Sequence, residues 1–281
     1  MKNLKKYNAN TFECFSSAVE RKRDITVKTR LEAIKPIINT VYKNYSKKLQ
    51  ENSIHSITPH KTFQNNLTLK NDLLGMYSYS SAIIRDIRHN IESQQTIATK
   101  GICQNCTINH ANTMDHMLPK ELYPEFAVNG ENLFPCCGEC NEYKGDICTP
   151  HSFLNLYSDI LPEQEYLFVR VDLTDGILDF EFYLDNPNGI ENILFNTITN
   201  HYKNLKLLQR LKDKANSELL EFIISIKSQY RKLDKQANID SVNESIFERR
   251  EVYGYNYWKC CLHHALINSP HFWEYLDQQL L

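Results

Sequence analysis

Hydrophobic residues in the first part of the chain recur at helical spacing. Between residues 28 and 49 they lie three or four positions apart, which predicts one helix with a single buried face. The residues of this face are Leu31, Ile34, Ile37, Ile38, Val41 and Tyr45. Pro36 lies inside the segment and predicts either a kink or a later start of the helix. We expect a loop over the polar residues 51–66 and a second helix over residues 71–99.

The pattern changes after Pro150. Residues 166–171 and 177–184 are rich in β-branched and aromatic side chains, and a Leu-Thr-Asp-Gly sequence separates them, which predicts a hairpin. Helical spacing returns over residues 193–233 and again over residues 245–281. The sequence therefore predicts an α+β fold that is mainly helical. We expect three regions: helices over 1–99, a compact module over 100–150, and a hairpin with further helices over 151–281.

Composition narrows the class of protein. Of the 281 residues, 42% are hydrophobic and 23% are charged, which excludes a largely disordered chain and suits one large domain or two smaller ones. No apolar run approaches the length of a membrane span. The basic N-terminus is not followed by the apolar segment of a secretory signal. We therefore expect a cytoplasmic protein that does not engage a membrane.

Charge is distributed unevenly although the formal net charge is only −2. Residues 1–50 contain 12 Lys and Arg against 4 Asp and Glu, whereas residues 121–191 contain 2 against 15. A bound polyanion such as DNA would therefore be held by the first helices, with Arg21, Lys22 and Arg23 as its contacts. The alternative is a set of solvated helix faces, and the same two interpretations apply to Arg85 and Arg88.

The cysteines point to a metal site. Their number, nine, is odd, and the chain has no export signal, which disfavours a disulfide framework. Cys103 and Cys106 form one C-x-x-C pair, and Cys137 and Cys140 form a second, as in sites where four thiolates bind zinc tetrahedrally. Redox chemistry or coincidence is the weaker alternative. Cys136 leaves the register of the second pair open, but only Cys137 has the correct spacing to Cys140. A closed four-thiolate site makes such a zinc structural.

A second tract, Cys260-Cys261-Leu262-His263-His264, also contains ligand-type residues. It follows an aromatic-rich helical stretch, and unoxidised cysteine is among the most buried residue types. We expect this tract to pack in a core.

The segment around the second cysteine pair carries residues suited to phosphodiester hydrolysis. That reaction needs an activated water and a cation beside the scissile phosphate. His116 suits a general base at neutral pH, while Asp115 and Asn141 offer hard oxygen ligands for Mg²⁺ or Mn²⁺. Adjacent side chains on a strand point to opposite faces, so Asp115 and His116 can share a site only near a bend, which Pro119 favours. Lys144 lies one helical turn after Asn141 and is expected to face the same phosphate, with a solvated lysine as the alternative.

The order D-H-x-x-P, N-L and C-x-x-C-N-x-x-K across residues 100–148 resembles the HNH nucleases, whose ββα-metal fold often contains a cysteine quartet. The resemblance covers about a sixth of the chain. It implies a ββα-metal module in which His116 is the base and Asp115 and Asn141 bind the catalytic ion. It also implies that Asn132 orients the loop that holds His116. Asn141 stands where many relatives carry a histidine, which favours Mg²⁺ or Mn²⁺ over softer ions.

The leading hypothesis is a metal-dependent HNH endonuclease that acts on DNA. The D-H-x-x-P-K start, the paired Cys136 and Cys137 and the trailing K-G-D resemble HNH subunits of Septu-type and retron-associated systems. This resemblance implies an effector of bacterial anti-phage defence that works beside an ATPase partner. The sequence has no P-loop motif, so that ATPase would be another chain. The alternative is a catalytically inactive, zinc-stabilised module for binding nucleic acid or another protein.

Overall fold

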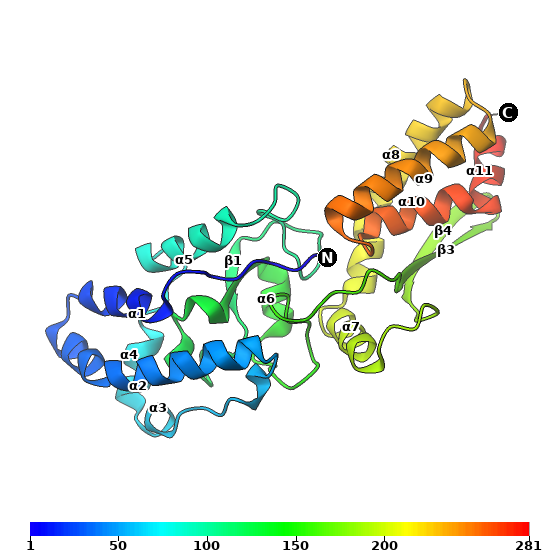
Figure 1. Cartoon of the computed structure of the whole chain (residues 1–281). Helices are drawn as coiled ribbons and strands as arrows, with labels where there is room; N and C mark the ends of the chain where they lie inside the picture. Colours follow the sequence, from blue (N-terminus) through cyan, green and yellow to red (C-terminus); the bar gives the residue numbers. More distant parts are fainter. Residues whose placement is uncertain (281) are drawn as a thin grey trace. The chain divides into compact units, whose positions relative to one another are not determined.

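The computed structural model describes residues 1–280 and has a mainly helical α+β architecture with two small antiparallel hairpins (Figure 1). This confirms the fold class expected from the sequence. The chain divides into two compact units. We call Asn3–Asn105 with Asn109–Ile160 the N-terminal unit, and Met1–Lys2, Cys106–Ile108 and the chain from Leu161 onward the C-terminal unit. The three regions expected from the sequence remain a prediction about which segments fold independently.

In the N-terminal unit, helices precede a small hairpin, and a short helix follows it. The helices are α1 (Thr11–Glu20), α2 (Ile25–Gln50), α3 (Lys61–Asn65), α4 (Leu67–Leu74), α5 (Ala82–Ser93) and α6 (Gly138–Lys144). Strand β1 (Thr113–His116) pairs antiparallel with β2 (Leu133–Cys136). Three short 3₁₀ helices complete the unit: η1 (Ile54–Ser56), η2 (Pro124–Phe126) and η3 (Gly130–Asn132).

The predicted apolar face of α2 packs in the core of this unit. Its buried residues are Leu31, Ile34, Ile38, Tyr42, Tyr45 and Leu49. The helix begins at Ile25, because the Asp24 carboxylate accepts hydrogen bonds from the amides of Thr26 and Val27 at 2.8 and 3.1 Å. Pro36 therefore lies inside α2 and does not mark its start.

Two expectations for residues 51–99 are wrong in part. The polar stretch 51–66 contains η1 and α3. The single helix expected over residues 71–99 is two helices, α4 and α5, joined by residues 75–81. Gly75 caps the end of α4, and the Ser81 hydroxyl accepts a hydrogen bond from the Ile84 amide at the start of α5. These caps interrupt the helix although the apolar spacing continues.

The C-terminal unit combines the second hairpin with five helices among the described residues. Strands β3 (Leu167–Thr174) and β4 (Ile177–Leu184) pair antiparallel, which confirms the predicted hairpin. Asp175 and Gly176 in the turn both have positive φ, at 53° and 75°, as a tight two-residue turn of the primed type requires. The helices are α7 (Asn192–Asn204), α8 (Leu207–Tyr230), α9 (Lys235–Tyr253), α10 (Trp258–Asn268) and α11 (Pro270–Leu280).

The helix expected over residues 193–233 is interrupted between α7 and α8. Lys206 adopts a left-handed conformation with φ of 52°, which an α-helix cannot contain. The helical stretch expected from residue 245 is part of α9, which begins ten residues earlier, followed by α10 and α11; Leu281, its expected end, lies outside the described residues. None of the described helices combines the length and apolar character that crossing a bilayer requires.

Candidate metal centre and acid–base site

Four cysteines form a buried cluster whose sulfur atoms all lie within 4.8 Å of one another: Cys103, Cys106, Cys137 and Cys140. Four thiolates around a tetrahedral zinc at about 2.3 Å are separated by about 3.8 Å. The cluster therefore could hold a structural metal such as zinc after only a small contraction. This is the quartet that the C-x-x-C spacing predicts.

In each cysteine pair a backbone amide donates a hydrogen bond to a sulfur atom, as it would to a thiolate ligand. The Cys140 amide donates a hydrogen bond to Cys137 Sγ at 3.4 Å, so Cys137 caps the N-terminus of α6 with its sulfur. The Ile108 amide donates to Cys106 Sγ, also at 3.4 Å. Cys136 has a different role: its thiol donates to the Cys137 carbonyl at 3.1 Å, and it is not part of the cluster. The structure thus supports the choice of Cys137 over Cys136.

Asp115 lies at the end of β1 and is almost fully buried. Its Oδ1 accepts hydrogen bonds from the His116 amide at 2.7 Å and from Lys144 Nζ at 3.3 Å. Its Oδ2 is buried and has no hydrogen-bond partner among the described residues. Burial raises the pKa of this carboxyl to about 6, although Lys144 partly opposes the shift. One buried acceptor is therefore left for a cation or a proton.

His116, the last residue of β1, is held by a backbone carbonyl. Its Nε2 lies 2.9 Å from the Ala127 oxygen, which can only accept, so Nε2 carries the hydrogen and Nδ1 carries the lone pair. The Tyr77 ring packs edge-on against the imidazole with centroids 4.6 Å apart. Burial lowers the pKa of His116 to about 4, against the opposing effect of the Ala127 carbonyl. The imidazole is therefore neutral at pH 7 and can accept a proton.

Lys144, the last residue of α6, is 5% exposed, so it is not a solvated lysine. Its Nζ donates to the His116 carbonyl at 2.6 Å and to Asp115 Oδ1 at 3.3 Å. The ammonium thus connects the end of α6 to the end of β1. The predicted contact of Lys144 with a phosphate stays a prediction.

Asn132 fixes the chain that follows His116. Its side chain is fully buried, donates to the carbonyls of Leu118 and Phe126 at 3.0 and 3.3 Å, and accepts from the Leu118 amide at 2.8 Å. The Phe126 carbonyl immediately precedes Ala127, whose oxygen holds His116. Asn132 thus connects the chain after His116 to the residue before Ala127, and its expected role in orienting this loop stays a prediction.

Three contacts of η3 could not be found from motif spacing. Glu131 is buried and accepts hydrogen bonds from Lys6 and from Ser46. A Cβ atom added to Gly130 would lie 2.6 Å from the Tyr7 ring, so this ring covers the glycine directly. The N-terminal segment thus packs on the element that carries Asn132. Only the acidic character of Glu131 and the absence of a side chain at Gly130 were visible in the sequence.

The remaining predicted site residues lie on α6 and at the corner between α1 and α2. The Asn141 carboxamide is half-buried and makes no hydrogen bond with the described residues. It lies one helical turn before Lys144 on α6. Arg21 pairs with Asp86 at 3.7 Å, Lys22 donates to the Gly75 carbonyl at 2.7 Å, and Arg23 is exposed.

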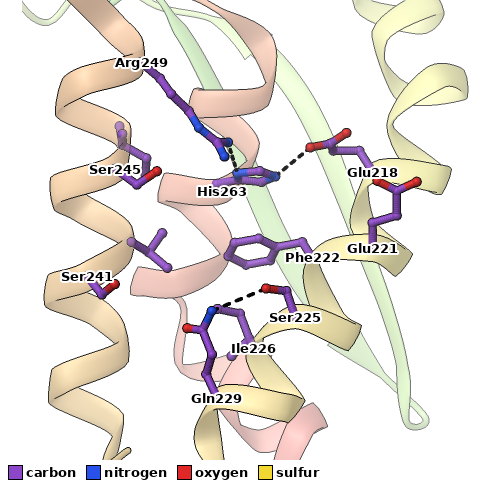
Figure 2. A pocket seen from close by; sticks show the side chains of 12 residues that line it. Glu218, Glu221, Phe222, Ser225, Ile226, Gln229, Ser241, Ser245, Arg249 and His263 are labelled. Atoms are coloured by element: carbon purple, nitrogen blue, oxygen red, sulfur yellow. Dashed lines mark hydrogen bonds and ion pairs between the residues drawn. The ribbon is translucent and has the colours of Figure 1, made fainter.

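Residues Cys260 to His263 of the second ligand-type tract pack in the C-terminal unit as expected, whereas His264 is exposed. Cys260 and Cys261 are buried, and within residues 1–280 this tract belongs to no metal-type cluster. The His263 ring stacks on Phe222 with centroids 4.3 Å apart. His263 lies between Arg249 and Glu218 (Figure 2). Its Nδ1 is 3.3 Å from Arg249 Nη1, and its Nε2 is 3.1 Å from Glu218 Oε1. These contacts account for His263 as a packed, hydrogen-bonded side chain.

Part of the chain is similar to a phage protein. The chain is 27% identical to protein ea31 of Escherichia phage lambda over an alignment of 189 residues, which covers 61% of this chain and 63% of the phage protein. The chain thus spans less than two thirds of the length of that relative. No family model matches the chain, and no solved structure matches it.

Proposed function

We propose that this protein is a metal-dependent endonuclease of the HNH type that hydrolyses phosphodiester bonds in DNA. One observation carries the proposal: His116, a neutral imidazole with Nε2 tied to the Ala127 carbonyl, lies next to Asp115, a carboxyl with one unpartnered buried oxygen. A proton acceptor and a hard ligand at adjacent positions are what metal-assisted attack of water on a phosphodiester requires.

In this proposal His116 accepts the proton of the attacking water at Nδ1. The hydrogen bond from Nε2 to Ala127 prevents the ring from turning and keeps the lone pair on Nδ1. Lys144 and Asn132 act as positioning residues, because they hold the end of β1 and the loop that supplies the Ala127 carbonyl.

Asp115 Oδ2 and the Asn141 carboxamide would hold the catalytic Mg²⁺ or Mn²⁺. Both are hard oxygen donors, and neither has a partner among the described residues. The ion would supply positive charge beside the scissile phosphate. The cysteine cluster would hold a separate, structural zinc, since four thiolates leave it no open position.

The biological setting is proposed from the resemblance alone. We propose an effector in anti-phage defence that acts in the cytoplasm and is controlled by an ATPase partner. Co-purification of the natively expressed protein tests the partner, and an isolated protein without an associated ATPase would contradict it.

A plasmid-cleavage assay tests the activity. Supercoiled DNA is incubated with the protein and Mg²⁺ or Mn²⁺, and nicked and linear products are measured. His116→Ala should lower the cleavage rate by roughly 10² to 10⁴-fold, as loss of a general base does. Asp115→Ala should also lower it, but added Mn²⁺ should partly restore Asp115→Ala because the damage is to metal binding.

His271→Ala, at an exposed position in α11, is the matched control and should cleave like the unaltered protein. Rescue of His116→Ala by Mn²⁺ to the same degree as Asp115→Ala would contradict the assignment of the base. A protein that contains zinc and binds DNA, yet does not cleave with any added metal, would support the inactive-module alternative.

A further inference from the structure

The loop between α4 and α5, residues 75–81, reaches the candidate acid–base site. Tyr77 packs its ring edge-on against His116, and its hydroxyl donates to the Met114 carbonyl in β1 at 2.9 Å. The pKa of Tyr77 is raised to about 12, first by burial and then by the nearby Asp115. The loop is therefore fixed to the strand that carries both candidate catalytic residues.

The same loop presents an arginine through an aromatic contact. Arg88 of α5 donates a hydrogen bond to the Tyr79 hydroxyl, and its guanidinium carbon lies 5.0 Å from the centroid of the Tyr79 ring. An aromatic ring restrains a guanidinium without neutralising its charge. Arg85 lies one turn earlier on α5, so the two arginines are neighbours on the helix surface.

These arginines differ from others in the unit. Arg30 is neutralised by Asp72 in a bidentate ion pair, at 2.6 and 2.9 Å. Arg23, Arg85 and Arg88 form no ion pair with any described carboxylate. Their charges are therefore available to an anionic ligand.

The basic corner between α1 and α2 adjoins this loop on another side. Lys22 donates to the Gly75 carbonyl at 2.7 Å, and Arg21 pairs with Asp86 of α5. Lys22 therefore ties the corner to the start of the loop, and Tyr77 ties the same loop to His116. The corner that carries Arg23 and the helix that carries Arg85 and Arg88 are thus both tied to the loop that contacts His116.

We propose that Arg88, presented by Tyr79, and its neighbours Arg85 and Arg23 bind the backbone phosphates of double-stranded DNA next to the scissile bond. The inference rests on the proposed function and adds the residues that deliver the substrate. Contacts of this kind position the duplex and carry no sequence preference. Tyr77 would fix the loop that presents Arg88 relative to His116, through its contacts with the imidazole and with β1.

Binding of a fluorescent DNA duplex, measured by anisotropy over a series of salt concentrations, tests this proposal without cleavage. No divalent ion is added, and the zinc-loaded protein is used. Each arginine that neutralises a phosphate contributes about 0.9 to the slope of log K against log salt. Arg88→Gln and Arg85→Gln should each weaken binding several-fold on any sequence and lower that slope by about one.

Arg88→Lys keeps the positive charge, so it should keep the salt slope of the unaltered protein, whereas Arg88→Gln should lower that slope by about one. Arg170→Gln is the surface control, since Arg170 already pairs with Glu181 and Asp172 in the other hairpin. An unchanged slope in Arg88→Gln, or a protein that does not bind the duplex, overturns the proposal. If Arg88→Gln lowers the salt slope of DNA binding as expected, but the unaltered protein never cleaves DNA, the DNA-binding proposal holds and the proposed nuclease activity is refuted.

Discussion

The cysteine cluster and the acid–base site lie at opposite ends of α6, yet they are built differently. The cluster consists of four like ligands supplied by two short turns, and Cys137 both caps α6 and belongs to the cluster. The acid–base site needs groups from across the unit: Asn132 for the loop, Ala127 for the imidazole and Lys144 for the strand end. Spacing within the sequence is therefore enough to predict the first site, whereas the second exists only in the folded chain.

The acid–base site depends on the cysteine cluster more than the cluster depends on the acid–base site. Loss of the cluster removes the cap of α6 and with it the support of Lys144. Loss of Lys144 affects the far end of the helix and leaves the four thiols in place. We therefore expect damage to spread from the cluster to the acid–base site and not the reverse.

The largest effect is expected from Cys137→Ser. It should reduce the zinc content from about one ion per chain to almost none, because a serine hydroxyl does not replace a thiolate ligand. Metal binding at such sites is coupled to folding, so the thermal unfolding transition should become broader or its midpoint temperature should fall sharply. Elemental analysis and calorimetry measure the two effects.

Cys136→Ser is the matched control for this prediction. Its thiol contacts the Cys137 carbonyl and lies outside the cluster, so this variant should retain its zinc. If Cys136→Ser lost the metal and Cys137→Ser kept it, the second cysteine pair would be misassigned.

A smaller effect is expected from Lys144→Met, which leaves the Asp115 charge buried without its partner. Breaking a buried ion pair in this way lowers the free energy of unfolding by about 3–5 kcal/mol. Adding Asp115→Asn should restore part of this loss, because it removes the uncompensated charge. Urea unfolding measures both, and zinc content should stay unchanged.

Lys120→Met is the control, since Lys120 pairs with Glu121 at the surface. Exposed pairs contribute about 0–1 kcal/mol, so little should change. If Lys120→Met and Lys144→Met lowered the free energy of unfolding equally, the buried ion pair of Lys144 would not be the stabilising contact. If Lys144→Met lost zinc, the cysteine cluster would depend on the acid–base site.

The smallest effect concerns pH. Burial lowers the pKa of His116 from 6.5 to about 4. Between these pH values the unfolded chain binds more protons than the folded one, so the free energy of unfolding decreases as the pH falls from 6.5 to 4. The pKa of Asp115 is raised from 3.8 to about 6, so its contribution is lost as the pH rises through that range. Between pH 4 and 6, His116 makes the free energy of unfolding increase with pH and Asp115 makes it decrease, so the two effects partly cancel.

Asp115→Asn removes the pH dependence of stability that comes from Asp115 and leaves that of His116. The unfolding free energy of this variant should then rise by roughly 1.5 kcal/mol from pH 5 to pH 6.5. This is less than the full value of about 1.4 kcal/mol per pH unit, because the unfolded imidazole is only half protonated at pH 6.5. The unaltered protein should gain clearly less over the same range. Urea unfolding at several pH values measures this, and parallel curves for the two proteins would refute the opposed shifts.

Local chemistry decided which features could be predicted from the sequence. The Asp-Gly turn between β3 and β4 and the two C-x-x-C pairs were predictable because each depends on residues close together in the chain. The breaks at Gly75 and Lys206 were not, since apolar spacing continues through both.

The acid–base site shows the same limit. Asp115 and His116 were found through a motif, but the burial of Lys144 depends on how α6 packs against β1. The contact between Tyr77 and His116 joins residues from separate elements, and no periodicity in the sequence indicates it.

The pairing of Lys6 with Glu131, where the N-terminal segment packs on η3, has a consequence for the time at which the site can form. These residues are 125 positions apart in the chain. At the roughly 5–20 residues per second of ribosomal synthesis, Glu131 is added about 6–25 s after Lys6. The Tyr7 ring has no Gly130 to cover during that interval. Asn132 and its loop thus reach their final environment only when about half of the chain has been made, so a newly started polypeptide carries no formed acid–base site.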